Sequence, residues 1–347
     1  MPLSFCLEPV PPFRLDLTVW ALRRRAENRV DSWDGRHYRR LLVINGRPRA
    51  ATVIQTGSPN APRLEVRVDG PDLSERDIPA VDHLLTRVLG LNLDLADFYR
   101  LAAADPALAP PADRFRGLKP PRFPTVFEAV VNAVACQQIS LNFGIRLLNR
   151  LAEAFGPALE VAGQLLRGFP TPEDLAGRQV DELRVLGFSR QKARAVYKLA
   201  GAVAGGLDLE GLAEVDGETA AARLRRLRGV GRWTAEYVLL RGLGRLDVFP
   251  GDDVGARNNL RRWLGLGEPL DYARTKALVD RWQPYAGLVY FHLLLEWLEG
   301  RGLVGREYNP VGVAWSGSKG STSRRSLPTA AGFWWSGSGP GALKRTP

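Results

Sequence analysis

The feature that most constrains this chain is a very short turn between two helical patterns, at Leu227–Tyr237. It reads Leu-Arg-Gly-Val-Gly-Arg-Trp-Thr-Ala-Glu-Tyr, and apolar residues recur at helical spacing on both sides of Gly-Val-Gly. Gly229 and Gly231 can adopt backbone angles that side chains forbid, so two helices can meet within three residues. The pattern therefore predicts a helical hairpin whose second helix directs unsatisfied N–H groups outward.

This hairpin is a candidate site for an anion. Free N–H groups at a helix start attract negative charge, and two arginines stand beside the glycines. The candidate contact for DNA phosphate is Arg228, Gly229, Val230, Gly231 and Arg232. Such a contact positions a protein without reading the base sequence. The alternative is a helical hairpin in which the glycines serve packing alone.

Most of the chain beyond residue 125 has helical spacing. The predicted helical segments are 127–135, 143–155, 180–186, 191–203, 217–227, 233–241, 253–264, 271–282 and 287–298. A second hairpin-like turn lies at Leu186–Ala193. There Ser189 can cap a helix and Arg190 and Lys192 can meet phosphate, although a solvated helix start explains the same residues.

The N-terminal part has a different pattern. Strands are predicted over 15–20, 38–44, 49–55 and 64–68, where apolar or β-prone residues alternate. Asn45-Gly46 is typical of a hairpin turn between two of them, and a helix is predicted over 77–90. The fold class is therefore α+β, a small antiparallel-sheet N-terminal domain followed by an all-α core.

Composition places the domain boundaries. Residues 102–124 are rich in Ala and Pro and are interpreted as a linker. The predicted units are 1–112, 113–304 and a disordered, basic, Ser/Gly-rich tail over 305–347. The net charge is +11, but five of these charges belong to the tail. Charge alone therefore favours nucleic acid only weakly.

Several classes of protein are excluded. No run approaches the ~18 apolar residues of a membrane helix, and no signal peptide is evident. The only two cysteines, Cys6 and Cys136, cannot supply an iron–sulfur cluster or a zinc site, and they indicate a reducing, cytoplasmic setting. The three histidines lack metal-ligand spacing, and no phosphate-binding P-loop or dinucleotide fingerprint is present.

A second motif follows the hairpin, Asp247-Val-Phe-Pro-Gly-Asp-Asp-Val254. Pro250 and Gly251 break the chain, and Asp252 and Asp253 open the next helix. Both acids are explained by helix capping alone. A carboxylate held at this helix start can also stabilise a developing sugar cation or orient a water.

Taken together, the two motifs resemble the helix-hairpin-helix (HhH-GPD) DNA glycosylase superfamily, and within it the AlkA-type DNA-3-methyladenine glycosylase II branch. Two further segments match that branch in the same order, Phe127–Ser140 and Trp282-Gln-Pro-Tyr-Ala-Gly-Leu-Val-Tyr-Phe-His292. The resemblance covers about residues 113–300, and the strand-rich N-terminal unit fits the additional α+β domain of the AlkA type.

The resemblance implies roles for individual residues. Asp253 matches the catalytic Asp, and Asp252 the structural one beside it. Related lyases carry Lys where this chain has Trp233, and an indole cannot form a Schiff base. A monofunctional enzyme without lyase activity is therefore predicted. The wedge that fills the gap left by a flipped base is placed at Gln138, flanked by Gln137 and Ile139, although two glutamines at a helix end can also be a simple polar pair.

Four aromatic residues are candidates for the base pocket, Trp233, Tyr237, Trp282 and Tyr285. Alkylation at a ring nitrogen makes a purine cationic, and aromatic faces attract cations. Such a base is also a good leaving group, so one carboxylate that stabilises the sugar cation can suffice. The alternative is that these rings are ordinary core aromatics.

The predicted function is a monofunctional DNA glycosylase that flips out alkylated purines of the 3-methyladenine type and leaves an abasic site in base excision repair. The alternatives are a glycosylase for deaminated or oxidised bases (hypoxanthine, 8-oxoguanine) and a non-catalytic DNA-binding protein. The expected partner is double-stranded DNA with damaged bases, bound by a monomer in the cytoplasm at the nucleoid, with no membrane contact. No cofactor is required, no iron–sulfur cluster is expected, and the family's hairpin can hold a monovalent cation on backbone carbonyls.

Overall fold

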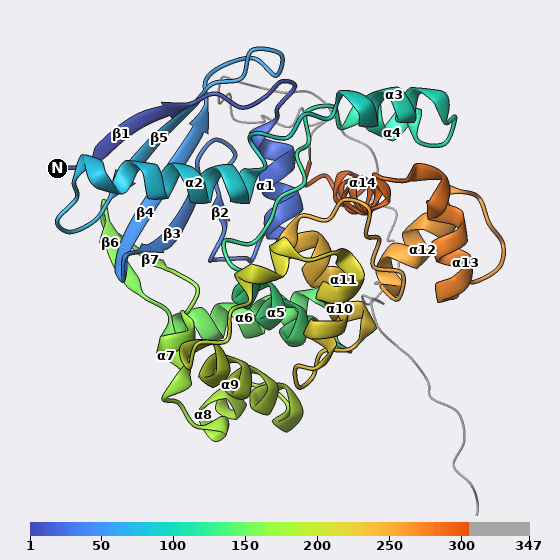
Figure 1. Ribbon diagram of the computed structural model, residues 1–347. Helices are drawn as coiled ribbons and strands as arrows, with labels where there is room; N and C mark the ends of the chain where they lie inside the picture. The colour runs from blue at the N-terminus through green and yellow to red at the C-terminus, as the bar shows by residue number, and fades with distance from the viewer. Residues whose placement is uncertain (305–347) are drawn as a thin grey trace, which may run out of the picture.

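The structure is a computed structural model that describes residues 1–304. Its N-terminal part is an antiparallel sheet in the order β1-β5-β4-β3-β2 (Figure 1). The strands are β1 (Leu3–Leu7), β2 (Ser32–Trp33), β3 (Tyr38–Ile44), β4 (Arg47–Gln55) and β5 (Leu64–Asp69). The predicted hairpin is confirmed, because Asn45 and Gly46 join β3 to β4 with left-handed φ angles of 50° and 73°. Such angles match the twist of the paired strands.

Helix α2 (Ile78–Leu89) lies along the sheet, as its apolar spacing predicts (Figure 1). Val81, Leu85 and Val88 are fully buried and belong to the same core as the inward-facing residues of β3, β4 and β5. The α+β character of the N-terminal part is confirmed.

The predicted strand over 15–20 is wrong, because this segment forms helix α1 (Leu15–Arg23). The apolar side chains of α1 divide, at helical spacing, between two cores. One set packs in the core of the sheet: Leu15, Val19 and Leu22. The other set packs in the core of the C-terminal helices: Leu17, Trp20 and Ala21. A helix buried on nearly all sides lacks a single apolar stripe, so Asp16 and Thr18 between the apolar residues produced a false period of two.

Most of the chain beyond residue 125 is helical, and each predicted helical segment is confirmed. The helices are α5 (Val126–Cys136), α6 (Leu141–Phe155), α7 (Pro172–Ala176), α8 (Val180–Val185), α9 (Arg190–Ala204), α10 (Gly217–Arg225), α11 (Arg232–Val238), α12 (Val254–Trp263), α13 (Tyr272–Val279) and α14 (Ala286–Glu299). A π-helical turn over Leu239–Leu243 continues α11, and 3-10 turns cover Glu75–Asp77, Glu210–Glu214 and Asp280–Trp282. A small hairpin of β6 (Ala158–Val161) and β7 (Gln164–Arg167) was not predicted, because its strands have four residues each.

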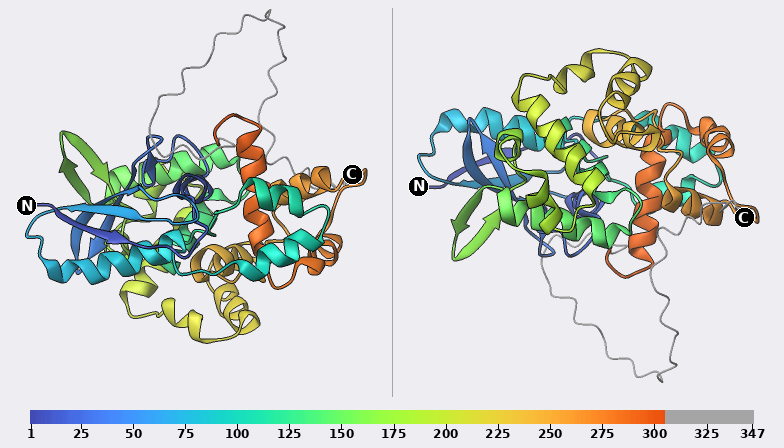
Figure 2. Two further views of the ribbon diagram at one scale, coloured as in Figure 1. Left: turned by 90° about the horizontal axis from the view of Figure 1, so that it is seen from above. Right: turned by 90° about the horizontal axis from the view of Figure 1, so that it is seen from below.

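The segment 102–124 is not a linker. It contains the end of α3 (Ala96–Ala104) and all of α4 (Ala109–Arg114), so a boundary at residues 112 and 113 falls inside a helix. Leu108, Phe115 and Leu118 are buried in the same core as α14, and the views of Figure 2 show α3 and α4 beside that helix. The Pro-Pro pair lies in the first turn of α4, where a missing N–H costs nothing.

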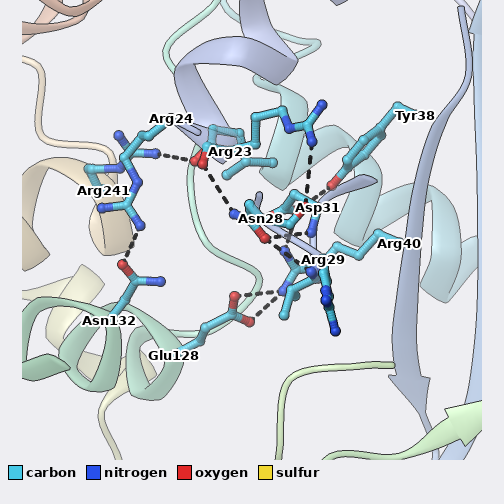
Figure 3. Close-up of polar contacts among 12 residues, drawn as sticks. Arg23, Arg24, Asn28, Arg29, Asp31, Tyr38, Arg40, Glu128, Asn132 and Arg241 are labelled. Carbon is cyan, nitrogen blue, oxygen red and sulfur yellow. Dashed lines mark hydrogen bonds and ion pairs between the residues drawn. The ribbon is translucent and has the colours of Figure 1, made fainter. Parts of the chain in front are cut away.

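The sheet and the helical part are joined by buried polar contacts. Arg40 on β3 forms ion pairs with Asp31 (2.5 Å) and with Glu128 on α5 (2.6 Å), and its side chain is 1% exposed. Tyr38 also donates its hydroxyl to Asp31 at 2.9 Å (Figure 3). Removing Arg40 would leave the carboxylates of Asp31 and Glu128 buried without their cation, and removing either carboxylate would leave Arg40 with one partner fewer. These contacts therefore fix the position of α5, whose C-terminal end borders the site described below.

No helix in residues 1–304 is long and apolar enough to cross a membrane. The predicted disordered tail, 305–347, lies outside the described residues.

Candidate active site

A cavity opens where α1, α5, α11, α12 and α14 meet, and we call it the Asp253 cavity. The residues that line it are Arg24, Cys136, Ile139, Leu141, Trp233, Tyr237, Asp252, Asp253, Gly255, Ala256, Asn259, Tyr290, Leu293 and Leu294. Most of this wall is apolar or aromatic, and Asp253 and Arg24 place opposite charges in it. Such a cavity suits a flat ligand with few polar groups.

Asp253 uses its two carboxylate oxygens differently. Oδ1 accepts the backbone N–H of Ala256 at 2.8 Å and caps α12. Oδ2 accepts the indole N–H of Trp233 at 3.2 Å and the hydroxyl of Tyr290 at 3.1 Å. The capping and functional interpretations of Asp253 are therefore compatible, because capping occupies one oxygen and leaves the other at the cavity wall.

Two predicted pocket residues, Trp233 and Tyr237, line the cavity together. They lie four apart on α11, and their rings are 5.4 Å apart at 32°. Burial raises the pKa of Tyr237, and burial together with the charge of Asp253 raises the pKa of Tyr290 well above its ordinary value. Both phenols therefore stay neutral at physiological pH, and the hydroxyl of Tyr290 remains a donor to Asp253.

The other two predicted pocket residues, Trp282 and Tyr285, do not line this cavity. The side chain of Trp282 is fully buried, stacks on Trp263 at 5.5 Å and donates its N–H to Asp105 at 2.8 Å. Tyr285 packs edge-on against Phe98 at 5.8 Å. The pocket prediction for Trp282 is therefore corrected to a core aromatic that ties the turn after α3 to the C-terminal helices. Tyr285 is half-buried at the edge of the same core, and its role in a base pocket stays a prediction.

The predicted hairpin between α10 and α11 is present and lies open to solvent. Gly229 has a left-handed φ of 80°, and the hairpin residues other than Val230 are exposed. Arg232 does not extend freely from it. Its guanidinium binds Asp252 at 2.6 Å and lies 3.7 Å from the ring centre of Tyr272. The hairpin is thus tied directly to the residue before Asp253.

A second brace on the Asp253 turn comes from a residue that the sequence analysis did not identify. Glu236 accepts the N–H of Gly251 at 2.9 Å and the hydroxyl of Tyr272 at 2.7 Å. Burial raises the pKa of Glu236, and burial and this hydrogen bond raise the pKa of Tyr272 to about 12. Because Gly251 lies two residues before Asp253, the brace fixes the start of α12.

The three predicted wedge residues separate into three environments. Gln138 is exposed, with a left-handed φ of 53°. Ile139 lines the Asp253 cavity. Gln137 turns inward, where its amide donates to the carbonyl of Gly229 and to the hydroxyl of Thr234, both at 2.8 Å. The prediction that Gln137 belongs to the wedge is therefore corrected to a link between the end of α5 and the hairpin.

Lys192 also supports this end of α5. Its ammonium donates to the carbonyls of Ala135 at 2.9 Å and Gln137 at 2.6 Å, and burial lowers its pKa. The predicted contact of Lys192 with phosphate is thus replaced by an internal one, although Ser189 does cap α9 as predicted. The turn that presents Gln138 is consequently held by both hairpin-like turns.

Two cavity residues, Arg24 and Tyr290, were not predicted. Tyr290 lies in a correctly predicted helix, but the sequence gives no sign of its contact with Asp253. Arg24 caps the C-terminal end of α1 and reaches across to hydrogen-bond Tyr237 on α11 at 2.9 Å. It was missed because α1 was predicted as a strand.

Residues 131–284 match the family model of the HhH-GPD superfamily base excision DNA repair protein. The part of the chain that carries the hairpin and Asp253 therefore matches this superfamily. Among the relatives of this chain is a DNA-3-methyladenine glycosylase of Bacillus subtilis, 37% identical over 172 residues, a match that covers 49% of this chain and 57% of the relative. This chain therefore spans little more than half of that relative's length.

Other relatives match nearly end to end. DNA-3-methyladenine glycosylase 2 of Escherichia coli is 26% identical over 287 residues, which are 82% of this chain and 94% of that protein. The structure of a 3-methyladenine DNA-glycosylase from Archaeoglobus fulgidus superposes with a TM-score of 0.74 at 29% identity and covers 84% of this chain and 97% of its own. These matches are too long to be confined to the helical part, so the similarity to 3-methyladenine glycosylases extends into the N-terminal sheet.

Among residues 1–304, no group of three or more His, Cys, Asp or Glu side chains is arranged to hold a metal ion. Cys136 lines the Asp253 cavity, whereas Cys6 is exposed on β1.

Proposed function

We propose that this protein is a monofunctional DNA glycosylase that releases alkylated purines of the 3-methyladenine type and leaves an abasic site. The observation that carries the proposal is the free face of Asp253. One carboxylate oxygen, oriented by Trp233 and Tyr290, stands at the wall of an aromatic cavity. Capping α12 does not require a carboxylate oxygen at a cavity wall. Cleavage of the glycosidic bond of a base bound in the cavity does require one.

The chemistry requires little more than these groups. A base flipped from the duplex enters the cavity and lies against Trp233 and Tyr237. As the bond from C1′ to the base nitrogen breaks, its electron pair leaves with the alkylated base and the sugar becomes an oxocarbenium-like cation. Asp253 stabilises this cation and orients a water, whose oxygen bonds to C1′ while one of its protons passes to the Asp253 carboxylate. Since an alkylated purine is already a good leaving group, no separate general acid is needed.

A lyase step is not expected. Such a step requires an amine that attacks C1′ and forms a Schiff base. Trp233 occupies the corresponding position and directs its N–H to Asp253. The product should therefore be an unnicked strand with an abasic site.

DNA would be held on the exposed hairpin and propped by Gln138. Phosphate would meet Arg228 and the backbone N–H groups near Gly231, while Arg232, already paired with Asp252, would contribute less. The protein is expected to act as a monomer, on DNA of the nucleoid.

A monovalent cation on the hairpin carbonyls would be an additional aid to phosphate binding. The carbonyl of Gly229 already accepts from Gln137, and the carbonyl of Gly231 accepts from Ala235. A carbonyl oxygen has a second lone pair, so these hydrogen bonds do not prevent the two carbonyls from coordinating a cation. The proposed chemistry at C1′ does not depend on such an ion, nor on any cofactor.

The test is base release from DNA treated with a methylating agent. The parent protein should release 3-methyladenine without strand nicks before alkali treatment. Asp253→Asn keeps the cap on α12 but removes the charge, so release should fall by about 10²- to 10³-fold. Asp271→Asn is a matched control, because Asp271 caps α13 in the same way, accepting Arg274 N–H at 2.7 Å, and is exposed. Release by Asp253→Asn at the parent rate would overturn the mechanism.

Two other outcomes lead to different functions. Preferential release of hypoxanthine or 8-oxoguanine would identify a glycosylase for deaminated or oxidised bases. Tight binding of abasic DNA with no release from any lesion would identify a non-catalytic DNA-binding protein.

A further inference from the structure

Arg24 is held in an unusual position at the Asp253 cavity. It is the C-cap residue of α1, with φ 60° and ψ −22°. This left-handed conformation favours glycine, and a larger residue adopts it at an energetic cost. Arg24 nevertheless places a long side chain there, and that side chain is 4% exposed. The surrounding structure thus maintains an arginine where helix-end chemistry alone would select glycine.

Neutral side chains surround the guanidinium of Arg24. It donates to the amide oxygen of Asn132 at 2.6 Å (Figure 3) and to the hydroxyl of Tyr237 at 2.9 Å, and its buried Nε has no hydrogen-bond partner. The side chain of Cys136 also interacts with the guanidinium. Within residues 1–304 it forms no ion pair with a carboxylate, although buried charges are normally paired.

Other buried arginines in this region have a structural explanation. Arg40 is neutralised by two carboxylates. Arg241 donates to the carbonyls of Ala21 and Leu22 and does not line the Asp253 cavity. All three arginines keep a buried Nε without a partner, and Arg24 differs from the other two because it lines the cavity. A ligand in the cavity could accept from the side of the guanidinium that borders it.

We propose that Arg24 is a specificity-determining residue that donates to the carbonyl edge of the flipped base, and that it thereby sets how well bases with a 6-carbonyl are released alongside the alkylated purines of the proposed function. The inference rests on the proposed function. Its chemical basis is the fork of the guanidinium, which matches the O6 and N7 acceptors of guanine, an edge that hypoxanthine shares. The same positive charge opposes a cationic base, so Arg24 also sets the balance between neutral and charged substrates.

Four substrates separate these two effects. 7-Methylguanine is cationic and carries the carbonyl, although its methyl group removes the N7 acceptor, and 3-methyladenine is cationic and lacks the carbonyl. Hypoxanthine is neutral and carries the carbonyl, and 1,N6-ethenoadenine is neutral and lacks it. Single-turnover release of each base should be compared for the parent, Arg24→Met and Arg24→Lys.

We expect Arg24→Met to lower hypoxanthine release by about 10- to 100-fold, the range for one hydrogen bond from a charged donor. 7-Methylguanine should fall less, because loss of the donor is offset by relief of charge repulsion. Release of 3-methyladenine should stay within about 3-fold or rise. Arg24→Lys keeps the charge without the fork, so it should lose hypoxanthine release without any gain for 3-methyladenine.

The matched control is Arg23→Met. Arg23 is equally buried, on the same helix end, but its guanidinium donates to the carbonyls of Trp33 and Ala26. It should lower thermal stability and leave the ratios among the four bases unchanged. A uniform loss over all four bases in both Arg24 variants would overturn the inference and leave Arg24 a structural residue. Failure of the parent protein to release any of the four would instead overturn the proposed function, and this inference with it.

Discussion

The two hairpin glycines should respond very differently to alanine, because only one of them is constrained by the fold. At Gly229 the backbone is left-handed, with φ 80°, and an added Cβ would lie 2.8 Å from the Cβ of Ala195 on α9. The angle costs about 1–2 kcal/mol and the overpacking about 1–3 kcal/mol. Gly229→Ala should therefore lower the free energy of unfolding by about 2–5 kcal/mol.

Gly231 is the matched control within the same turn. Its φ of −93° suits any residue, and an added Cβ would meet nothing within 4 Å. Gly231→Ala should cost less than about 1 kcal/mol, as a poorer N-cap. The new methyl would, however, stand on the exposed face proposed to meet phosphate, so affinity for a duplex with an abasic-site analogue should fall by about 10-fold or more.

Urea unfolding and DNA titration of both variants separate stability from binding. If Gly231→Ala destabilised the protein as much as Gly229→Ala, the geometric argument would be refuted. If Gly231→Ala kept full stability and bound DNA like the parent, the hairpin would not be the phosphate contact.

Two further predictions concern residues away from Asp253. Trp282→Phe removes the hydrogen bond to Asp105 and part of the stack on Trp263. The free energy of unfolding should therefore fall by about 2 kcal/mol, while the ratios among the released bases stay constant. A changed ratio would mean that Trp282 belongs to the base pocket after all. Burial lowers the pKa of His292 to about 4. Below the unfolded pKa near 6.5, the unfolded state binds a proton that the folded state does not bind. The free energy of unfolding should therefore fall by about 3 kcal/mol as the pH drops from about 6.5 to about 4. Urea midpoints across this range should show a smaller acid loss for His292→Asn, and an equal loss would contradict the assignment.

The parts of the fold that were predicted depend on short-range chemistry. Asn45-Gly46 specified a hairpin because the two residues themselves adopt the required angles. The glycines of the α10–α11 turn did the same for two helices. Helix α1 failed because its pattern is set by two cores that are distant in sequence, one under the sheet and one among the C-terminal helices. The spacing of apolar residues within α1 does not reveal that they pack in two different cores.

The base pocket shows the same limit. Trp233 and Tyr237 were identified correctly as a pair because one helix turn brings them together. Trp282 was assigned to the cavity by resemblance, but Tyr290 occupies the position beside Asp253. Trp282 lies in the 3-10 turn before α14 and Tyr290 lies on α14 itself, and sequence spacing alone does not show which of them faces the cavity. Arg24 required still more, since its partner Tyr237 is 213 residues away.

Asp253 illustrates why a catalytic candidate is hard to separate from a capping residue. Asp216 and Asp271 also precede helices and accept backbone N–H groups, at 2.8 and 2.7 Å, much as Asp253 does at 2.8 Å. Local sequence therefore gives the three acids the same role. What distinguishes Asp253 is the second oxygen, which accepts from Trp233 and Tyr290 at a cavity wall. A cap orients a carboxylate, because the helix start holds one oxygen and leaves the other at the cavity wall, where Trp233 and Tyr290 fix its position. The local signal for capping is thus part of how this site is built, and it cannot by itself argue against function.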